Sequence, residues 1–162
     1  MSDTNATQTS DQPVFSVEKL YVRDLSIEVP NAPQCFLERE TPNIDVQLAT
    51  AATRLDEGFF DVRLTVTVTA KIGQDKTLFL IEVAQAGIFQ IRNVPEENLE
   101  PLLFVACPSL LYPYAREVVT SASLRAGFQP VILAPVNFEA LYAQQKQQAE
   151  LARAGESQTP LQ

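Results

Sequence analysis

The chain of 162 residues has no histidine, and this removes the side chain that enzymes use most often for acid–base chemistry. A Ser-His triad and a histidine-ligated metal site are excluded with it. The five glycines are scattered, so they form neither a phosphate-binding loop nor a dinucleotide-binding fingerprint. The two cysteines, Cys35 and Cys107, form no CxxC pair, and we expect both to be buried thiols in a reducing cytosol. We therefore expect no enzyme, no cofactor and no metal site.

Positive charge is also scarce, because 12 Lys and Arg residues face 20 Asp and Glu residues, giving a formal net charge of −8. This balance argues against a nucleic-acid partner, whose phosphates are bound largely by clustered Lys and Arg, and it suits a partner with a basic surface. Residues 1–12 lack the cationic and apolar parts of a signal peptide. From the sequence, we expect no stretch that is long and apolar enough to span a bilayer. We expect a soluble, cytoplasmic protein without direct membrane insertion.

The pattern of apolar residues changes once along the chain, from a period of two to a helical period. We expect one folded domain at 13–146, between a disordered N-terminal tail at 1–12 and a mobile C-terminal tail at 147–162. Alternation predicts strands near 14–29, 44–48, 60–69 and 77–91. Helical spacing then predicts a long helix that ends at Gly127 and a last helix capped by Asn137. The fold class is α+β: a four-stranded antiparallel sheet with two helices on one face.

Two local features of these elements can also be predicted. In the first strand the apolar residues change phase after Val17 and again after Val22, which requires a β-bulge, a twist or burial on both faces. Further along, the Cys107-Pro108 step predicts a break in the chain, followed by a long helix with Ser109 as its N-cap.

Acidic side chains gather on the sheet face that we expect to meet water. This group comprises Asp24, Glu28, Asp45, Asp61 and Glu82, with Ser26 among them and Arg63 as the one nearby counter-charge. Leu80 stands two residues before Glu82 and adds an apolar spot on the same face. Such a mixture can dock a basic partner through charge steering and desolvation. The alternative is an ordinary solvated face whose charges prevent aggregation.

A second candidate surface is the apolar, proline-bounded connection before the last helix. With part of the second strand as its floor, it could form one wall of a groove for extended polypeptide, binding with little sequence preference. The candidate groove residues are Val46, Leu48, Phe128, Val131, Leu133, Phe138, Leu141 and Tyr142. The alternative is that the connection simply covers its own sheet.

Apolar surface on the fourth strand and on the long helix exceeds what one small domain requires. Ile81 and Val83, together with the helix stripe through Val118, are therefore candidates for self-association. Ordinary core packing is the alternative for each of them.

Several separated motifs resemble the SecB protein-export chaperone family. Cys107-Pro-Ser-Leu-Leu-Tyr-Pro-Tyr-Ala-Arg-Glu117 and Leu133-Ala-Pro-Val-Asn-Phe-Glu-Ala-Leu-Tyr142 resemble its C-terminal half. Val29-Pro-Asn-Ala-Pro-Gln-Cys-Phe36 resembles the family's segment after the first strand, while Val66-Thr-Val-Thr-Ala70 and Gly87-Ile-Phe89 resemble its third and fourth strands. The motifs follow one another in the family's order, but Gln34 replaces the usual histidine and Ala86 replaces a glycine.

The resemblance implies a cytosolic, ATP-independent holdase without enzymatic activity. Such a chaperone keeps unfolded precursor proteins competent for translocation and delivers them to the SecA ATPase. It also implies a homotetramer, a dimer of dimers, with Ile81, Val83 and Gln85 facing the tetramer interface. The positions that correspond to the SecA-docking residues are Asp24, Glu28, Leu80 and Glu82.

Two other functions remain open at this point. One is a SecB-like chaperone dedicated to a toxin–antitoxin pair, which the gene neighbourhood would discriminate. The other is a carboxylate-based hydrolase built on Asp24, Glu28 and Glu82. Carboxylates on a flat, exposed sheet face keep ordinary pKa values, so they make a poor active site.

Overall fold

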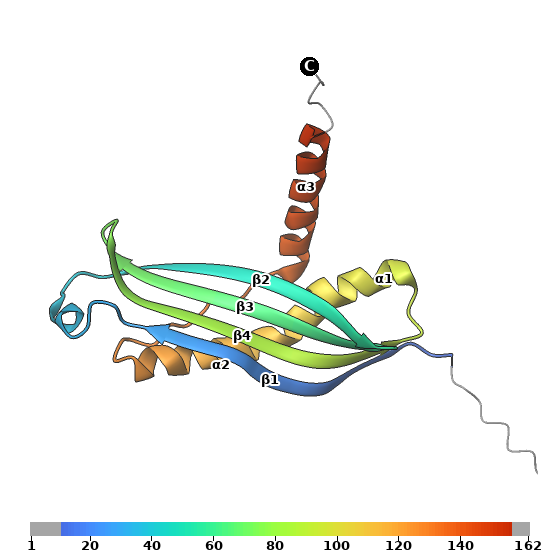
Figure 1. Cartoon of the computed structure of the whole chain (residues 1–162), viewed down its shortest axis with the longest axis horizontal. Helices are drawn as coiled ribbons and strands as arrows, with labels where there is room; N and C mark the ends of the chain where they lie inside the picture. The colour runs from blue at the N-terminus through green and yellow to red at the C-terminus, as the bar shows by residue number, and fades with distance from the viewer. Residues whose placement is uncertain (1–10, 157–162) are drawn as a thin grey trace, which may run out of the picture.

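The computed structural model describes residues 11–156 as a long antiparallel sheet with helices on one side (Figure 1). The strands are β1 (Val14–Glu28), β2 (Asn43–Asp56), β3 (Phe59–Ile72) and β4 (Lys76–Arg92), with a short 3-10 helix, η1 (Gln34–Leu37), after β1. The helical elements are α1 (Glu96–Pro101), the π-helical η2 (Leu102–Ala106), α2 (Cys107–Arg125) and α3 (Phe138–Glu156). The predicted α+β class and four-stranded antiparallel sheet are confirmed.

The strands lie in the order β1-β4-β3-β2, so β1 and β2 form the edges of the sheet. The pairing of β1 with β4 shifts register between Val17 and Lys19 and again between Val22 and Asp24. These two bulges confirm the irregularity expected from the changes of phase. Because a bulge adds one residue to its strand, the two bulges return the apolar side chains of β1 to one face of the sheet.

The core lies between this face of the sheet and α2. Alternate side chains of β3 from Val62 to Val68 are fully buried there, which explains the strict apolar alternation in that strand. Leu111, Ala115 and Val119 of α2 are fully buried on the other side of the core. The packing is close, since a Cβ added to Gly87 of β4 would lie 3.2 Å from a methyl group of Leu111.

The predicted break at Cys107-Pro108 is wrong, because helical structure runs without interruption from Glu96 to Arg125. The π-helical η2 ends just before Pro108, and its wider turn relieves the clash of a proline ring with the preceding turn. Ser109 is not an N-cap, since its hydroxyl donates a 2.6 Å hydrogen bond to the Val105 carbonyl one turn earlier.

Contrary to the expectation from the sequence, this helical run is long and apolar enough, by length and composition alone, to cross a membrane. Core helices of soluble proteins often share both properties. Here α2 packs along the sheet, and this packing accounts for its apolar stripe.

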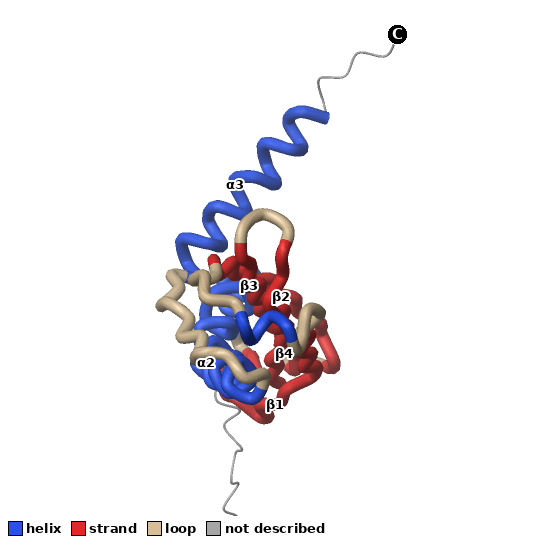
Figure 2. The backbone as a smooth tube through the Cα atoms, turned by 90° about the vertical axis from the view of Figure 1, so that its left-hand side faces the viewer, coloured by secondary structure: helices blue, strands red, loops and turns tan. Residues whose placement is uncertain are grey.

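Only one of the two predicted helices covers the sheet, because α3 projects away from it (Figures 1 and 2). Its start is fixed as predicted, with the Asn137 side-chain oxygen accepting a 3.0 Å hydrogen bond from the Ala140 amide. The Phe138 ring packs edge-on against Tyr112 at 5.5 Å between centroids. The helix continues to Glu156, beyond the expected end of the folded domain at residue 146. Most of the expected N-terminal tail and the last residues of the C-terminal tail lie outside the described residues.

Candidate functional site

An apolar groove of about 610 Å³ lies at the end of the sheet where β3 turns into β4. Its floor comes from β2 and the start of β4, through Ile44, Val46, Leu78 and Phe79. One wall is the segment between β1 and β2, which includes η1. The other wall is the connection between α2 and α3, residues 129–135, which we call the strap. Segments far apart in sequence therefore meet at this groove.

Three phenylalanine rings form the aromatic part of the groove. Phe128 packs against Phe79 at 4.6 Å and against Phe36 at 5.2 Å between ring centroids. Gly127 makes the second contact possible, because a Cβ there would lie 3.1 Å from the Phe36 ring. Gly127 also has a φ of +89°, the left-handed conformation that ends α2 where the sequence predicts. The cluster presents aromatic surface from three separate elements.

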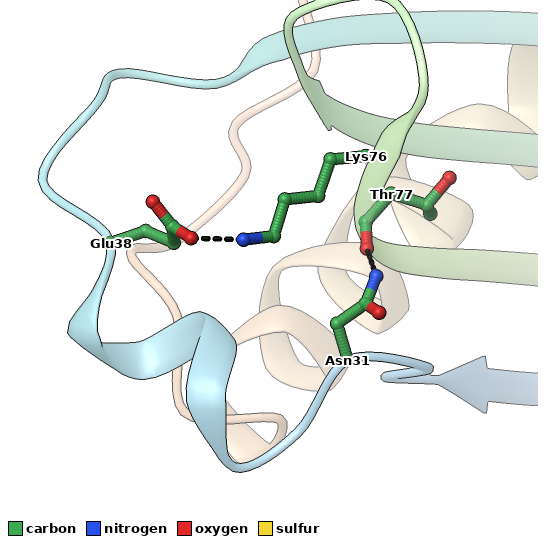
Figure 3. Close-up of polar contacts among 4 residues, drawn as sticks. All are labelled: Asn31, Glu38, Lys76 and Thr77. Carbon is green, nitrogen blue, oxygen red and sulfur yellow. Dashed lines mark hydrogen bonds and ion pairs between the residues drawn. The ribbon is translucent and has the colours of Figure 1, made fainter.

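The first wall is attached to the start of β4 by two polar contacts (Figure 3). The side-chain amide of Asn31 donates a 2.8 Å hydrogen bond to the Thr77 carbonyl. The Lys76 ammonium pairs with the Glu38 carboxylate, and both side chains are partly exposed. These contacts lie on either side of η1 in sequence and so hold Phe36 at the mouth of the groove.

The structure brings together four of the eight predicted groove residues: Val46, Phe128, Val131 and Leu133 all line it. The other four lie elsewhere. Leu48 is half-buried against the core, and Phe138 is buried beside Tyr112. Leu141 packs against the core, and Tyr142 stacks on Phe104 at 6.4 Å. Sequence reasoning missed Phe36, Leu78 and Phe79; for Phe36 the available signal was an aromatic residue in a proline-marked segment after a strand.

The predicted docking residues share the sheet face that points away from α2. In the first row across the strands, Glu28 pairs with Leu80, which in turn faces Thr69 and then Asp45. Glu82 stands in the next row, where its carboxylate accepts a hydrogen bond from Thr67 at 3.3 Å. Asp24 stands in the third row, opposite Ala84.

We call this surface the acidic face and define it by Asp24, Glu28, Asp45, Leu80 and Glu82. Its four carboxylates are exposed, and Leu80 is half-exposed.

Asp61 does not join the acidic face, contrary to the sequence prediction. Only 8% of it is exposed, and its carboxylate accepts a 2.6 Å hydrogen bond from the Tyr21 hydroxyl. Arg23, the residue at the second bulge of β1, lies 3.7 Å from the same carboxylate. The hydrogen bond to Asp61 raises the pKa of Tyr21 above its ordinary value. Arg23 is therefore a second cation near this face, besides Arg63.

The residues predicted at an oligomer interface lie mostly inside the single chain. Ile81 and Val83 are completely buried and Gln85 is 3% exposed, while Val118 is half-buried on α2. The Gln85 amide nitrogen donates to the Tyr21 carbonyl at 3.2 Å, and its side-chain oxygen finds no partner among the described residues. Large apolar side chains of β1 and α2 remain exposed instead, namely Phe15, Val17, Val22, Leu25, Ile27, Leu110, Tyr114 and Leu124.

Within residues 11–156, no group of three or more Cys, Asp and Glu side chains is placed to hold a metal ion. The two candidate binding surfaces are an open apolar groove and a flat acidic face. Together with the open sheet, they define an α+β protein whose surfaces are suited to binding other polypeptides.

The chain belongs to the SecB family: the family model described as preprotein translocase subunit SecB matches residues 8–149. The protein-export protein SecB of Chromobacterium violaceum is 67% identical over 144 residues, covering 88% of this chain and 95% of that protein. SecB of Aromatoleum aromaticum is 62% identical over 151 residues, covering 93% and 95%. Among solved structures, a Mycobacterium tuberculosis SecB-like chaperone in complex with an antitoxin peptide has a TM-score of 0.63 at 18% identity, covering 75% of this chain and 90% of that one, and so shares the fold.

Proposed function

We propose that the protein is an ATP-independent export chaperone that binds unfolded precursor proteins in the cytosol, keeps them translocation-competent and delivers them to the SecA ATPase. The observation that carries this proposal is the apolar groove, with three phenylalanines from separate elements on an open surface. The relatives named protein-export protein SecB support it. The SecB-like chaperone that was solved with a peptide supports polypeptide as the occupant.

Client binding in this groove depends on burial of apolar area. The lining is mostly aliphatic and aromatic, and its charged members, Glu38 and Glu40, come from one wall. Since apolar burial is non-directional, many different unfolded sequences can bind with similar affinity. Such binding requires no enzymatic step and no nucleotide.

The acidic face is the proposed site for SecA. Its carboxylates lie in three consecutive rows, and Leu80 stands in the first row between Glu28 and Asp45. A basic partner segment with an apolar side chain complements this arrangement, because charge speeds the encounter and the apolar contact adds affinity. This face points away from the core helix, so a client in the groove leaves it accessible.

The proposed quaternary structure is a homotetramer, a dimer of dimers. The exposed apolar side chains of β1 and α2 are suited to pack against a second copy. In this arrangement Ile81 and Val83 support the interface from beneath, as part of the core of each chain.

The experiment that tests the function is refolding of an unfolded precursor in the presence of the purified protein without ATP. We expect slower refolding, together with a measurable complex between the protein and SecA. An unaltered refolding rate at saturating chaperone concentration contradicts the holdase function. Tight binding of a single antitoxin, with no effect on precursors, would instead support a chaperone of a toxin–antitoxin pair.

A further inference from the structure

The strap is neither helix nor strand, and it makes no backbone ladder with any neighbouring strand of the described chain. Side-chain hydroxyls of α2 bind its backbone instead. The Thr120 hydroxyl donates a 2.7 Å hydrogen bond to the Val131 carbonyl, and the Val131 amide donates a 3.0 Å hydrogen bond to the Ser123 hydroxyl oxygen. At the other end of the strap, the Tyr112 hydroxyl donates to the Ala134 carbonyl.

Because the groups that form these hydrogen bonds lie at or near the core, the bonds favour one position of the strap over all others. Ser123 is completely buried, and Val131 and Leu133 are 9% and 3% exposed. The Ser123 hydroxyl donates its proton to the Thr120 carbonyl at 2.8 Å, so its oxygen lone pairs are free to accept from the Val131 amide. If the strap moves away, a buried donor and a buried acceptor lose their partners together.

The strap is also one wall of the groove. Val131, Ile132 and Leu133 all line the groove beside Phe128; Val131 and Leu133 are buried, whereas Ile132 between them is 73% exposed. The opposite wall packs through Cys35, which is buried in the core, and through Phe36, but its polar attachments are the partly exposed Glu38–Lys76 pair and one exposed hydrogen bond from Asn31. Exposed pairs of this kind hold a segment weakly. The hydroxyls of α2, which are buried or half-buried, therefore fix the strap as the wall against which an apolar client side chain must pack.

We propose that Tyr112, Thr120 and Ser123 form a hydroxyl latch that sets the width of the groove and thereby its preference among client side chains. They are positioning residues, since each acts through the strap. The inference rests on the proposed function. It adds a specificity determinant that lies on α2 beneath the groove wall.

Ser123→Ala and Thr120→Val test the latch, because each removes a hydroxyl with little change in volume. The matched control is Ser121→Ala on the same helix, a half-exposed residue whose hydroxyl oxygen accepts a 3.4 Å hydrogen bond from Arg125 and has no other hydrogen bond among residues 11–156. Two measurements are needed on the full-length protein. One is hydrogen exchange at the Val131 and Leu133 amides, and the other is the affinity for two otherwise identical unfolded peptides that carry phenylalanine or alanine as the apolar anchor.

We expect Val131 exchange to accelerate at least tenfold in Ser123→Ala, and the preference for phenylalanine over alanine to fall at least threefold. A wall that is no longer fixed loses more contact with a large ring than with a methyl group. Ser121→Ala should alter neither quantity. If Ser123→Ala fails to fold, Tyr112→Phe tests the latch through the ratio of the two peptide affinities, since it removes only the bond at the Ala134 end of the strap.

Two results overturn the inference while leaving the proposed function intact. The first is unaltered exchange at the strap. The second is faster exchange with an unaltered ratio of the two peptide affinities, which assigns the hydroxyls to fold stability alone. If the wild type binds neither peptide, the groove does not take clients, and the proposed function fails together with the role of the latch in client choice.

Discussion

The hydroxyl of Tyr21 donates a 2.6 Å hydrogen bond to the carboxylate of Asp61 and so connects the edge strand β1 to β3 across the intervening β4. On this face of β4, Ala86 pairs with Tyr21 and Ile88 pairs with Asp61, so the hydrogen bond crosses over the small Ala86 side chain. The bond lies next to the second bulge of β1, beyond which Asp24 takes its place on the acidic face. This half-buried hydrogen bond therefore fixes the position of β1, the strand that carries two of the proposed docking carboxylates.

Replacing Tyr21 with phenylalanine should lower the free energy of unfolding by about 1–3 kcal/mol. The change leaves the buried Asp61 carboxylate with only the longer contact to Arg23, and hydrogen bonds to charged groups contribute in this range. Urea denaturation measures the effect. Tyr142→Phe is the control, because that hydroxyl has no hydrogen-bond partner in the part of the chain that the structure describes. Equal losses in the two variants would show that the Tyr21 bond contributes nothing specific.

Alkaline pH should destabilise the protein through Cys107, whose pKa burial raises to about 12 from an ordinary value of 9.0. Between these values the unfolded chain loses the thiol proton and the folded chain keeps it. Stability therefore falls as the pH rises through this window, by about 1.4 kcal/mol per pH unit at most, and is unaffected by this group below it. Comparing the free energy of unfolding of wild type and Cys107→Ala from pH 8 to 11 isolates the effect. Parallel curves for the two proteins would contradict it.

Reversing a charge on the acidic face should weaken SecA binding by several-fold or more. In Glu82→Lys the loss should be largest at low ionic strength, because salt screens exposed charges. Leu80→Ala should also weaken binding, with less dependence on salt. Affinity of both variants at two salt concentrations provides the measurement, and Glu57→Lys in the β2–β3 turn makes the same charge change outside this face. Unchanged affinity in Glu82→Lys and Leu80→Ala would place the docking site elsewhere.

Oligomer formation should depend on the exposed face of β1. Leu25 is 45% exposed, so Leu25→Asp should split the proposed tetramer while the chain stays folded. Val83→Arg, by contrast, puts a charge into a fully buried position and should unfold the chain itself. Light scattering combined with thermal unfolding distinguishes the two outcomes. A Leu25→Asp protein of unchanged mass would remove β1 from the proposed interface.

Client affinity should depend on the aromatic cluster of the groove. Phe128→Ala removes the ring that contacts both Phe36 and Phe79, and should weaken client binding by about 1–2 kcal/mol. Polar replacement of Leu141 and Tyr142 should have a smaller effect, since neither lines the groove. Calorimetry with one unfolded precursor compares the variants. The reverse order of effects would move the client site to α3.

The sequence was sufficient for elements whose pattern repeats locally. The alternation in β3 predicted its buried face, and the changes of phase in β1 predicted irregularities that the two bulges account for. It was insufficient where distant segments meet. Asp61 stands at a polar position of the alternating pattern in β3, which predicts exposure to solvent, yet Tyr21 covers it from two strands away. Phe36 joins the groove because the chain folds back, and no local period records that contact. Pro108 suggested a break because sequence spacing does not reveal a π-helical turn before it.

The two bulges of β1 also protect the single chain from aggregation. β1 is a 15-residue edge strand with apolar side chains on one face, a combination that favours strand-to-strand aggregation. Each bulge interrupts the regular row of amide and carbonyl groups, and charged residues stand at both interruptions, Glu18 and Arg23. An incoming strand can therefore pair with only short stretches of this edge. The bulge that positions Asp24 therefore also limits pairing between the edge strand of a newly made chain and the extended polypeptides around it.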